Sequence, residues 1–171
     1  NTTCSKWRVK EIMIKISENV EQWECEYTDC RAACCRRSNP LTIFDVKKIS
    51  QRQGLDWNEF ADFDEDKVRL FLKKGDNGCI FLDDDCKCSI YGFKPLVCRL
   101  LPFEISGVVQ ADEPILHLKP IDECPGYGNG PTLDDDFIWQ VERDATLYLH
   151  ENQKLCREFR EEDRDIDALL G

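Results

Sequence analysis

The sequence has no long apolar run, no surplus of basic residues and very little histidine. Its longest apolar candidate, Pro95 to Ile105, is interrupted by Arg99 and Pro102 and falls short of the roughly 18 residues that a membrane span needs. A formal net charge of −11 over 171 residues excludes a basic nucleic-acid-binding face, which requires clustered Lys and Arg. The first ten residues lack the apolar segment of a secretory signal. We therefore expect a cytoplasmic protein with no membrane span and no nucleic-acid partner.

Several common metal motifs are also missing. The sequence contains no C-x2-C pair, which excludes the thioredoxin motif and zinc-ribbon pairs, and it lacks the C-x2-C-x2-C-x3-C spacing of bacterial ferredoxins. The two histidines, His117 and His150, have no His or Cys at ligand spacing. Any metal site should therefore consist almost entirely of thiolates.

Cysteine, in contrast, is abundant. The eleven positions are Cys4, Cys25, Cys30, Cys34, Cys35, Cys79, Cys86, Cys88, Cys98, Cys124 and Cys156. An odd count, an adjacent pair and a Cys-x-Cys step suit ligands better than disulfides, because a disulfide demands a specific geometry that neighbouring residues reach only under strain. Without a secretory signal, such crowding favours a metal site over a disulfide scaffold or reduced core cysteines.

Hydrophobic spacing predicts three helical segments around the first cysteines. Apolar residues at three- and four-residue intervals favour an N-terminal helix over about residues 6–23, against a short alternation through Ile12, Ile14 and Ile16. The capping box Thr42-x-x-Asp45 predicts a helix over about residues 43–53. A further helical turn is expected within residues 56–63.

The second half predicts short strands and a long helix. Two apolar runs at residues 79–82 and 88–91 flank an aspartate-rich turn and indicate a small hairpin. A short helix that carries Cys98 and Arg99 should begin at Lys94-Pro95 and end before Pro102. Further short strands are expected near residues 108–118, and a C-terminal helix over about residues 133–161.

One turn of helix would place the sulfurs of Cys30 and Cys34 on the same face and turn Cys35 about 100° away. The adjacent cysteines Cys34 and Cys35 thus either serve different sites, or one of them only packs. Together these elements predict an α+β, mostly helical fold: a small cysteine-rich single domain, residues 1–171, with short β-hairpins built around one or two metal centres. The terminal helices should pack on a cysteine-cluster core over residues 25–126.

Local sequence words then indicate a family. In chain order they are Cys25-x4-Cys30-x3-Cys34-Cys35, Leu41-Thr42 with Asp45, Cys79-Ile80-Phe81-Leu82, Cys88-Ser89-Ile90-Tyr91, Lys94-Pro95-Leu96-Val97-Cys98-Arg99 with Pro102-Phe103, and Cys124-Pro125-Gly126. This order resembles the CxxxCxxCC cysteine-cluster family (YkgJ-like), described as zinc- or iron-chelating. The chain departs from the family in longer gaps within the first cluster, and in carrying Lys94 where relatives usually carry Arg.

The resemblance implies eight ligand positions, with Cys86 as an extra thiol: Cys25, Cys30, Cys34, Cys35, Cys79, Cys88, Cys98 and Cys124. Eight thiolates can hold two four-coordinate centres, or one centre plus structural thiols. We favour an iron–sulfur (4Fe–4S) cluster over zinc, because all-cysteine ligation and the Cys124-Pro125 context point that way. Lys94, Arg36, Arg37 and Arg99 lie next to these positions and should lower the pKa of nearby thiols.

On this basis we expect a cluster-binding module for electron transfer or for a larger redox complex, with a protein partner. One alternative is a structural zinc-binding interaction module. Another is a component of a protein-modifying enzyme, since the same cysteine domain occurs in flagellin lysine methylases. No nucleophile with a base partner is evident, so no catalytic residue is assigned.

Overall fold

The computed structural model describes residues 12–66, 68–109, 114–160 and 165–170. In chain order its elements are β1 (Met13–Ile16), β2 (Gln22–Trp23), α1 (Ala33–Arg36), β3 (Pro40–Leu41), α2 (Ile43–Gln53), α3 (Trp57–Phe60), β4 (Ala61–Phe63), β5 (Leu70–Leu72), β6 (Lys74–Gly75), β7 (Gly78–Cys79), the 3-10 helix η1 (Tyr91–Phe93), α4 (Leu96–Arg99), β8 (Phe103–Val109), β9 (Ile115–Pro120), β10 (Tyr127–Thr132), α5 (Asp135–Arg160) and α6 (Ile166–Leu170).

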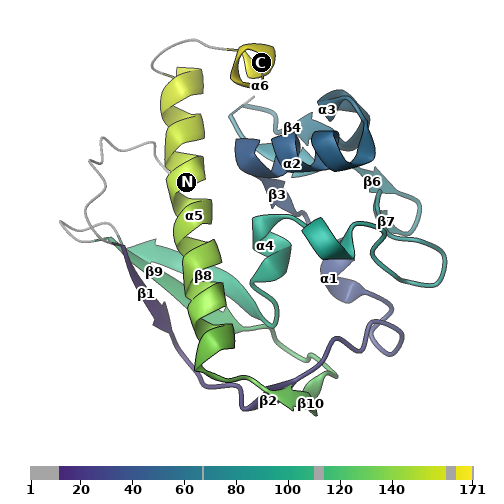
Figure 1. Cartoon of the computed structure of the whole chain (residues 1–171), viewed down its shortest axis with the longest axis vertical. Helices are drawn as coiled ribbons and strands as arrows, with labels where there is room; N and C mark the ends of the chain where they lie inside the picture. The colour runs from purple at the N-terminus through teal and green to yellow at the C-terminus, as the bar shows by residue number, and fades with distance from the viewer. Residues whose placement is uncertain (1–11, 67, 110–113, 161–164, 171) are drawn as a thin grey trace.

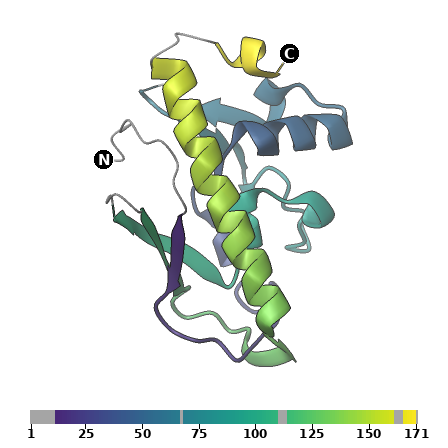
Figure 2. The same cartoon turned by 60° about the vertical axis from the view of Figure 1, so that its left-hand side comes forward.

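The long helix α5 lies between two apolar cores (Figure 1). Its first half places Val141, Ala145 and Leu149 against the sheet β1-β9-β8, in which β1 runs parallel and β8 antiparallel to the central strand β9. Its second half places Leu155 in the other core, which contains α2 and the sheet β3-β5-β4. Figure 2 shows α5 crossing from one half to the other. One helix thereby joins both halves of the molecule.

The expectation of a mostly helical fold is wrong, because the protein is a mixed α+β structure with 37% helix and 26% strand. Ten strands form four small sheets in the described part of the chain. The N-terminal helix expected over residues 6–23 is wrong in its described portion, where β1 and β2 occur; residues 6–11 lie outside the described residues. The alternation Ile12, Ile14, Ile16 prevails because β9 supplies a strand partner and Ile14 and Ile16 pack on the adjoining core.

The helix over residues 43–53 is confirmed as α2, with its capping box. The Thr42 hydroxyl accepts a hydrogen bond from the Asp45 backbone N–H, and Asp45 accepts one from the Thr42 backbone N–H. Both side chains are fully buried. The second oxygen of Asp45 accepts from the backbone N–H of Leu96, the first residue of α4, at 2.9 Å. The start of α4 is thus fixed to the start of α2.

The short helix before Pro102 is confirmed as α4, and the C-terminal helix as α5. Asp134 caps α5, since its carboxylate accepts from the Phe137 backbone N–H. The expected hairpin over residues 79–91 is reduced to one antiparallel bridge between Leu82 and Cys88, and β7 pairs with β6 instead. Among the residues placed in the structure, no helix combines the length and apolarity that crossing a bilayer requires.

Candidate metal centre

Nine cysteines line a single cavity of about 690 Å³ between the two cores. They are the eight predicted ligand positions, Cys25, Cys30, Cys34, Cys35, Cys79, Cys88, Cys98 and Cys124, together with Cys86. All of them are free thiols. Cys156 lies on α5 and does not line this cavity, and Cys4 lies outside the described residues. The fold therefore gathers thiols that are up to 99 positions apart in the sequence (124 − 25 = 99).

The ribbon formed by β2 and β10 brings Cys25 and Cys124 together. Trp23 is paired with Tyr127, and the Glu24 backbone N–H donates to the Gly126 carbonyl at 3.2 Å. The close approach depends on Gly126, because a Cβ there would lie 2.0 Å from the Glu24 carbonyl oxygen.

The Trp23 indole N–H also donates to the Cys124 sulfur at 3.4 Å. The Tyr127 hydroxyl donates a hydrogen bond to the carbonyl oxygen of Ile121, the residue after β9, at 2.7 Å. This bond links the ribbon to the end of β9. Burial, followed by the nearby Cys124, raises the pKa of Tyr127 to about 12. The phenol therefore stays protonated and keeps this contact at neutral pH.

Cys30 and Cys34 follow the ribbon on a tight turn rather than on one continuous helix. Arg31 and Ala32 adopt left-handed backbone conformations, with φ of 50° and 52°, before α1 begins at Ala33. The expectation of a full helical turn between the two cysteines is therefore wrong. The turn still leads both thiols to the cavity.

Cys35 lies against β7, on the other side of α1. The backbone of Gly78 packs so closely that a Cβ there would lie 3.0 Å from the Cys35 carbonyl oxygen. Cys79 is buried in the apolar core around α2, and Cys35 and Cys88 pack against that same core. Cys98 comes from α4, whose first residue is held by Asp45.

Burial is the main cause that raises the pKa of six thiols: Cys25, Cys34, Cys35, Cys79, Cys88 and Cys98. The pKa of Cys35 rises to about 12. Lys94 opposes the increase in pKa at Cys25, Cys88 and Cys98. Lys94 thus acts in the expected direction, because it opposes the rise in thiol pKa. Burial has the larger effect, so the net pKa of these thiols is raised and not lowered. These thiols stay protonated at neutral pH until a metal displaces the proton.

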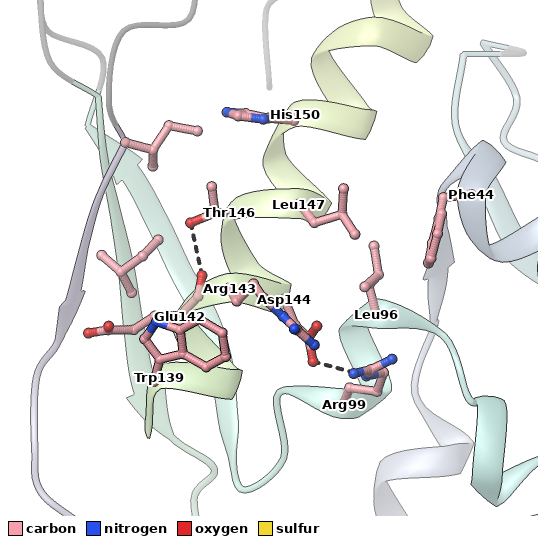
Figure 3. A pocket seen from close by; sticks show the side chains of 12 residues that line it. Phe44, Leu96, Arg99, Trp139, Glu142, Arg143, Asp144, Thr146, Leu147 and His150 are labelled. Atoms are coloured by element: carbon pink, nitrogen blue, oxygen red, sulfur yellow. Dashed lines mark hydrogen bonds and ion pairs between the residues drawn. The ribbon is translucent and has the colours of Figure 1, made fainter. Parts of the chain in front are cut away.

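Of the other basic residues, Arg37 opposes the rise in pKa that burial causes at Cys34, and it forms an ion pair with Glu104. Arg99 points away from the thiols. Its guanidinium bonds Asp144 on α5 at 2.9 Å, and this carboxylate is 3% exposed. Figure 3 shows the pair among the side chains that line a second pocket, which also include Trp139 and Arg143. Arg99 therefore fixes α4 to α5.

The donor set fits a soft metal in its chemistry, because it consists of thiols alone. In the described ranges, no three His, Cys, Asp or Glu side chains are placed so that they could hold a single metal ion as they stand. The thiols therefore surround a space instead of converging on one point. Ligation requires them to lose their protons and to turn toward a common centre.

Two neighbours of the thiols were missed from the sequence. Cys86, set aside as an extra cysteine, lines the cavity from a turn in which its φ is 63°. Trp23 falls within the predicted N-terminal helix, and its indole donates to the sulfur of Cys124, 101 positions away, a contact that local spacing does not indicate. The capping box did reveal Asp45, but nothing in the sequence indicates its bond to Leu96, 51 positions away.

Comparison with curated proteins and with solved structures gave no significant match. A family model matches residues 24–125, which is 102 of 171 residues and includes all eight predicted ligand cysteines. Its name, CxxCxxCC, prescribes two-residue gaps, whereas the gaps in this chain are four residues and three residues long. The chain belongs to the CxxCxxCC family, described as a "putative zinc- or iron-chelating domain".

Proposed function

We propose that this protein binds an iron–sulfur cluster in the cysteine-lined cavity and serves electron transfer, alone or within a larger redox complex. The observation that carries the proposal is the cavity of about 690 Å³, whose lining includes nine free thiols. A structural zinc site is closed, with four sulfurs about 2.3 Å from one ion. In a 4Fe–4S cluster each thiolate binds a different iron, so the four sulfurs lie farther apart and need more space. Thiols that surround a space suit a cluster better than a single ion.

The bound cluster would supply reversible one-electron transfer. Several residues of the chain would adjust the reduction potential of the cluster. The Trp23 indole N–H would withdraw charge from the Cys124 thiolate, and hydrogen bonds to ligand sulfur influence the potential. Lys94 and Arg37 offset the charge of the thiolates. The apolar core around Cys79 excludes water from one side of the cavity.

Anaerobic purification tests the proposal directly. We expect a brown protein with iron and acid-labile sulfide in equal amounts, little zinc, and visible absorption that bleaches on reduction and returns on oxidation. A matched preparation of a variant that replaces all eight predicted ligands with serine should be colourless. A colourless, zinc-loaded wild-type protein without sulfide would refute the cluster.

A structural zinc module is the second candidate, and the family description supports it by naming zinc as well as iron. Its test is chelation: the chain should unfold when zinc is removed, with no redox signal before or after. The expected single domain over residues 1–171, the cytoplasmic location, the protein partner and the link to lysine methylation are further predictions, which await their own experiments.

A further inference from the structure

We infer that the eight ligand cysteines form two separate four-thiol sites, site A with Cys25, Cys30, Cys34 and Cys124, and site B with Cys35, Cys79, Cys88 and Cys98. The inference rests on the proposed function in requiring that the cavity binds metal. It does not depend on which metal is bound.

Site A is built on the β2–β10 ribbon. The pairing of Trp23 with Tyr127 and the bond from Glu24 to Gly126 hold the backbones beside Cys25 and Cys124 against each other. Cys30 is linked to the same segment, because its backbone N–H donates to the Glu26 carbonyl at 3.3 Å. The next turn delivers Cys34 at the start of α1.

Site B is built on the apolar core around α2. Cys79 is 8% exposed within that core, and both Cys35 and Cys88 pack against it. Gly78 brings β7 against the Cys35 backbone, and the Leu82–Cys88 bridge closes the loop that contains Cys88. The fourth thiol, Cys98, is carried by α4, which the Asp45 carboxylate fixes to α2.

Packing divides the two adjacent cysteines in the same way. Cys35 packs against the apolar core around α2, whereas Cys34 is not among the residues that pack against it.

Cys98 lies on α4, whose first residue is bonded to Asp45 on α2, so it belongs with the thiols of that core. The boundary between the sites therefore runs through the peptide bond between Cys34 and Cys35. This explains why two cysteines are adjacent: consecutive residues can present their sulfurs in different directions, one to each site.

Metal counting on full-length variants tests the two-site arrangement. Purified apoprotein is loaded in separate experiments with Co²⁺ and with iron plus sulfide, and bound metal and sulfide per chain are measured. The variants are Cys124→Ser and Cys30→Ser for site A, and Cys88→Ser and Cys98→Ser for site B. Cys86→Ser and Cys156→Ser are controls, the former inside the cavity and the latter outside it. Circular dichroism identifies variants that fail to fold, and the second variant of each site then replaces the first.

We expect a site A variant and a site B variant each to lose about half of the metal, a combined A and B variant to lose all of it, and both controls to retain it. If each folded single variant loses all of the metal, or if Cys86→Ser loses half, the two-site arrangement is overturned. A third outcome is that the wild type binds two Co²⁺ per chain, each single-site variant binds one, and no sulfide is incorporated. This outcome would support the two sites and refute the cluster. A wild-type chain that binds neither probe would refute both.

Discussion

The carboxylate of Asp45 connects two helices. One oxygen accepts from the backbone N–H and hydroxyl of Thr42, and the other accepts from the backbone N–H of Leu96. Asp45 is fully buried, and burial raises its pKa despite these hydrogen bonds. The residue therefore matters more than an ordinary helix cap, because its removal would leave donors at two helix starts without a partner.

We expect Asp45→Ala to lower the free energy of unfolding by about 3 kcal/mol, since buried donors would lose a charged acceptor. Asp56→Ala is the matched control: Asp56 and Glu59 form a capping box on α3 at the surface, and its loss should cost about 1 kcal/mol. Urea unfolding of the two apoprotein variants measures both effects. Equal losses would show that the bond to Leu96 contributes nothing.

Lys94 affects thiols of both sites, because it opposes the rise in pKa that burial causes at Cys25, Cys88 and Cys98. Its ammonium group also lies 4.1 Å from the centre of the Tyr91 ring, which holds it near the cavity. Tyr91 itself is 59% exposed, so this contact lies at the surface.

In Lys94→Met the thiols lose this cation and bind protons more tightly. The midpoint of Co²⁺ loading should therefore move upward by about half a pH unit. Thiolate-to-cobalt absorption measured against pH reports the midpoint. Lys47→Met, on the exposed face of α2, should leave it unchanged. An identical shift in the two variants would assign the effect to net charge alone.

At the scale of elements, the β2–β10 ribbon depends on one glycine. The Cβ of Gly126→Ala would lie 2.0 Å from the Glu24 carbonyl oxygen, so the strands must separate. We expect a loss of about 2 kcal/mol in the free energy of unfolding and loss of the metal of site A, with site B still loaded. Gly107→Ala in β8 is the control, since no atom lies within 4 Å of its added Cβ. Full metal content in Gly126→Ala would contradict the role of the ribbon.

Elements that depend on local chemistry could be predicted from the sequence, and elements that need a distant partner could not. The helix α2 begins and ends at the expected residues because its capping box and Gly54 act locally. The strand β1 was misread as helix, because its partner β9 lies about 100 residues further on and supplies the pairing that a four-residue alternation lacks.

At the candidate site too, contacts between distant segments could not be predicted from the sequence. The cysteine spacing and the family resemblance led to eight positions that all line one cavity. Their roles as ligands remain predictions. Their division into sites depends on Gly78, on the Leu82–Cys88 bridge and on the ribbon, and these are contacts between segments that spacing does not specify.

At the scale of the whole molecule, the two sites share a border at Cys34 and Cys35, whose Cα atoms are about 3.8 Å apart. If both sites hold reduced clusters, their electron spins must interact. The fully reduced wild type should then give a split electron paramagnetic resonance spectrum, and Cys124→Ser or Cys88→Ser should give a simple one. If the wild-type spectrum equals the sum of the two variant spectra, the electron spins do not interact. The two centres would then be too far apart to lie on either side of Cys34 and Cys35.

The ribbon that holds Cys25 and Cys124 also joins the two ends of the family segment, because Glu24 bonds directly to Gly126 just past residue 125. A segment whose ends lie side by side can be inserted into a host protein without stretching the host. In this chain, the adjacent ends let β1, which precedes the family segment, and α5, which follows it, meet in the same apolar core.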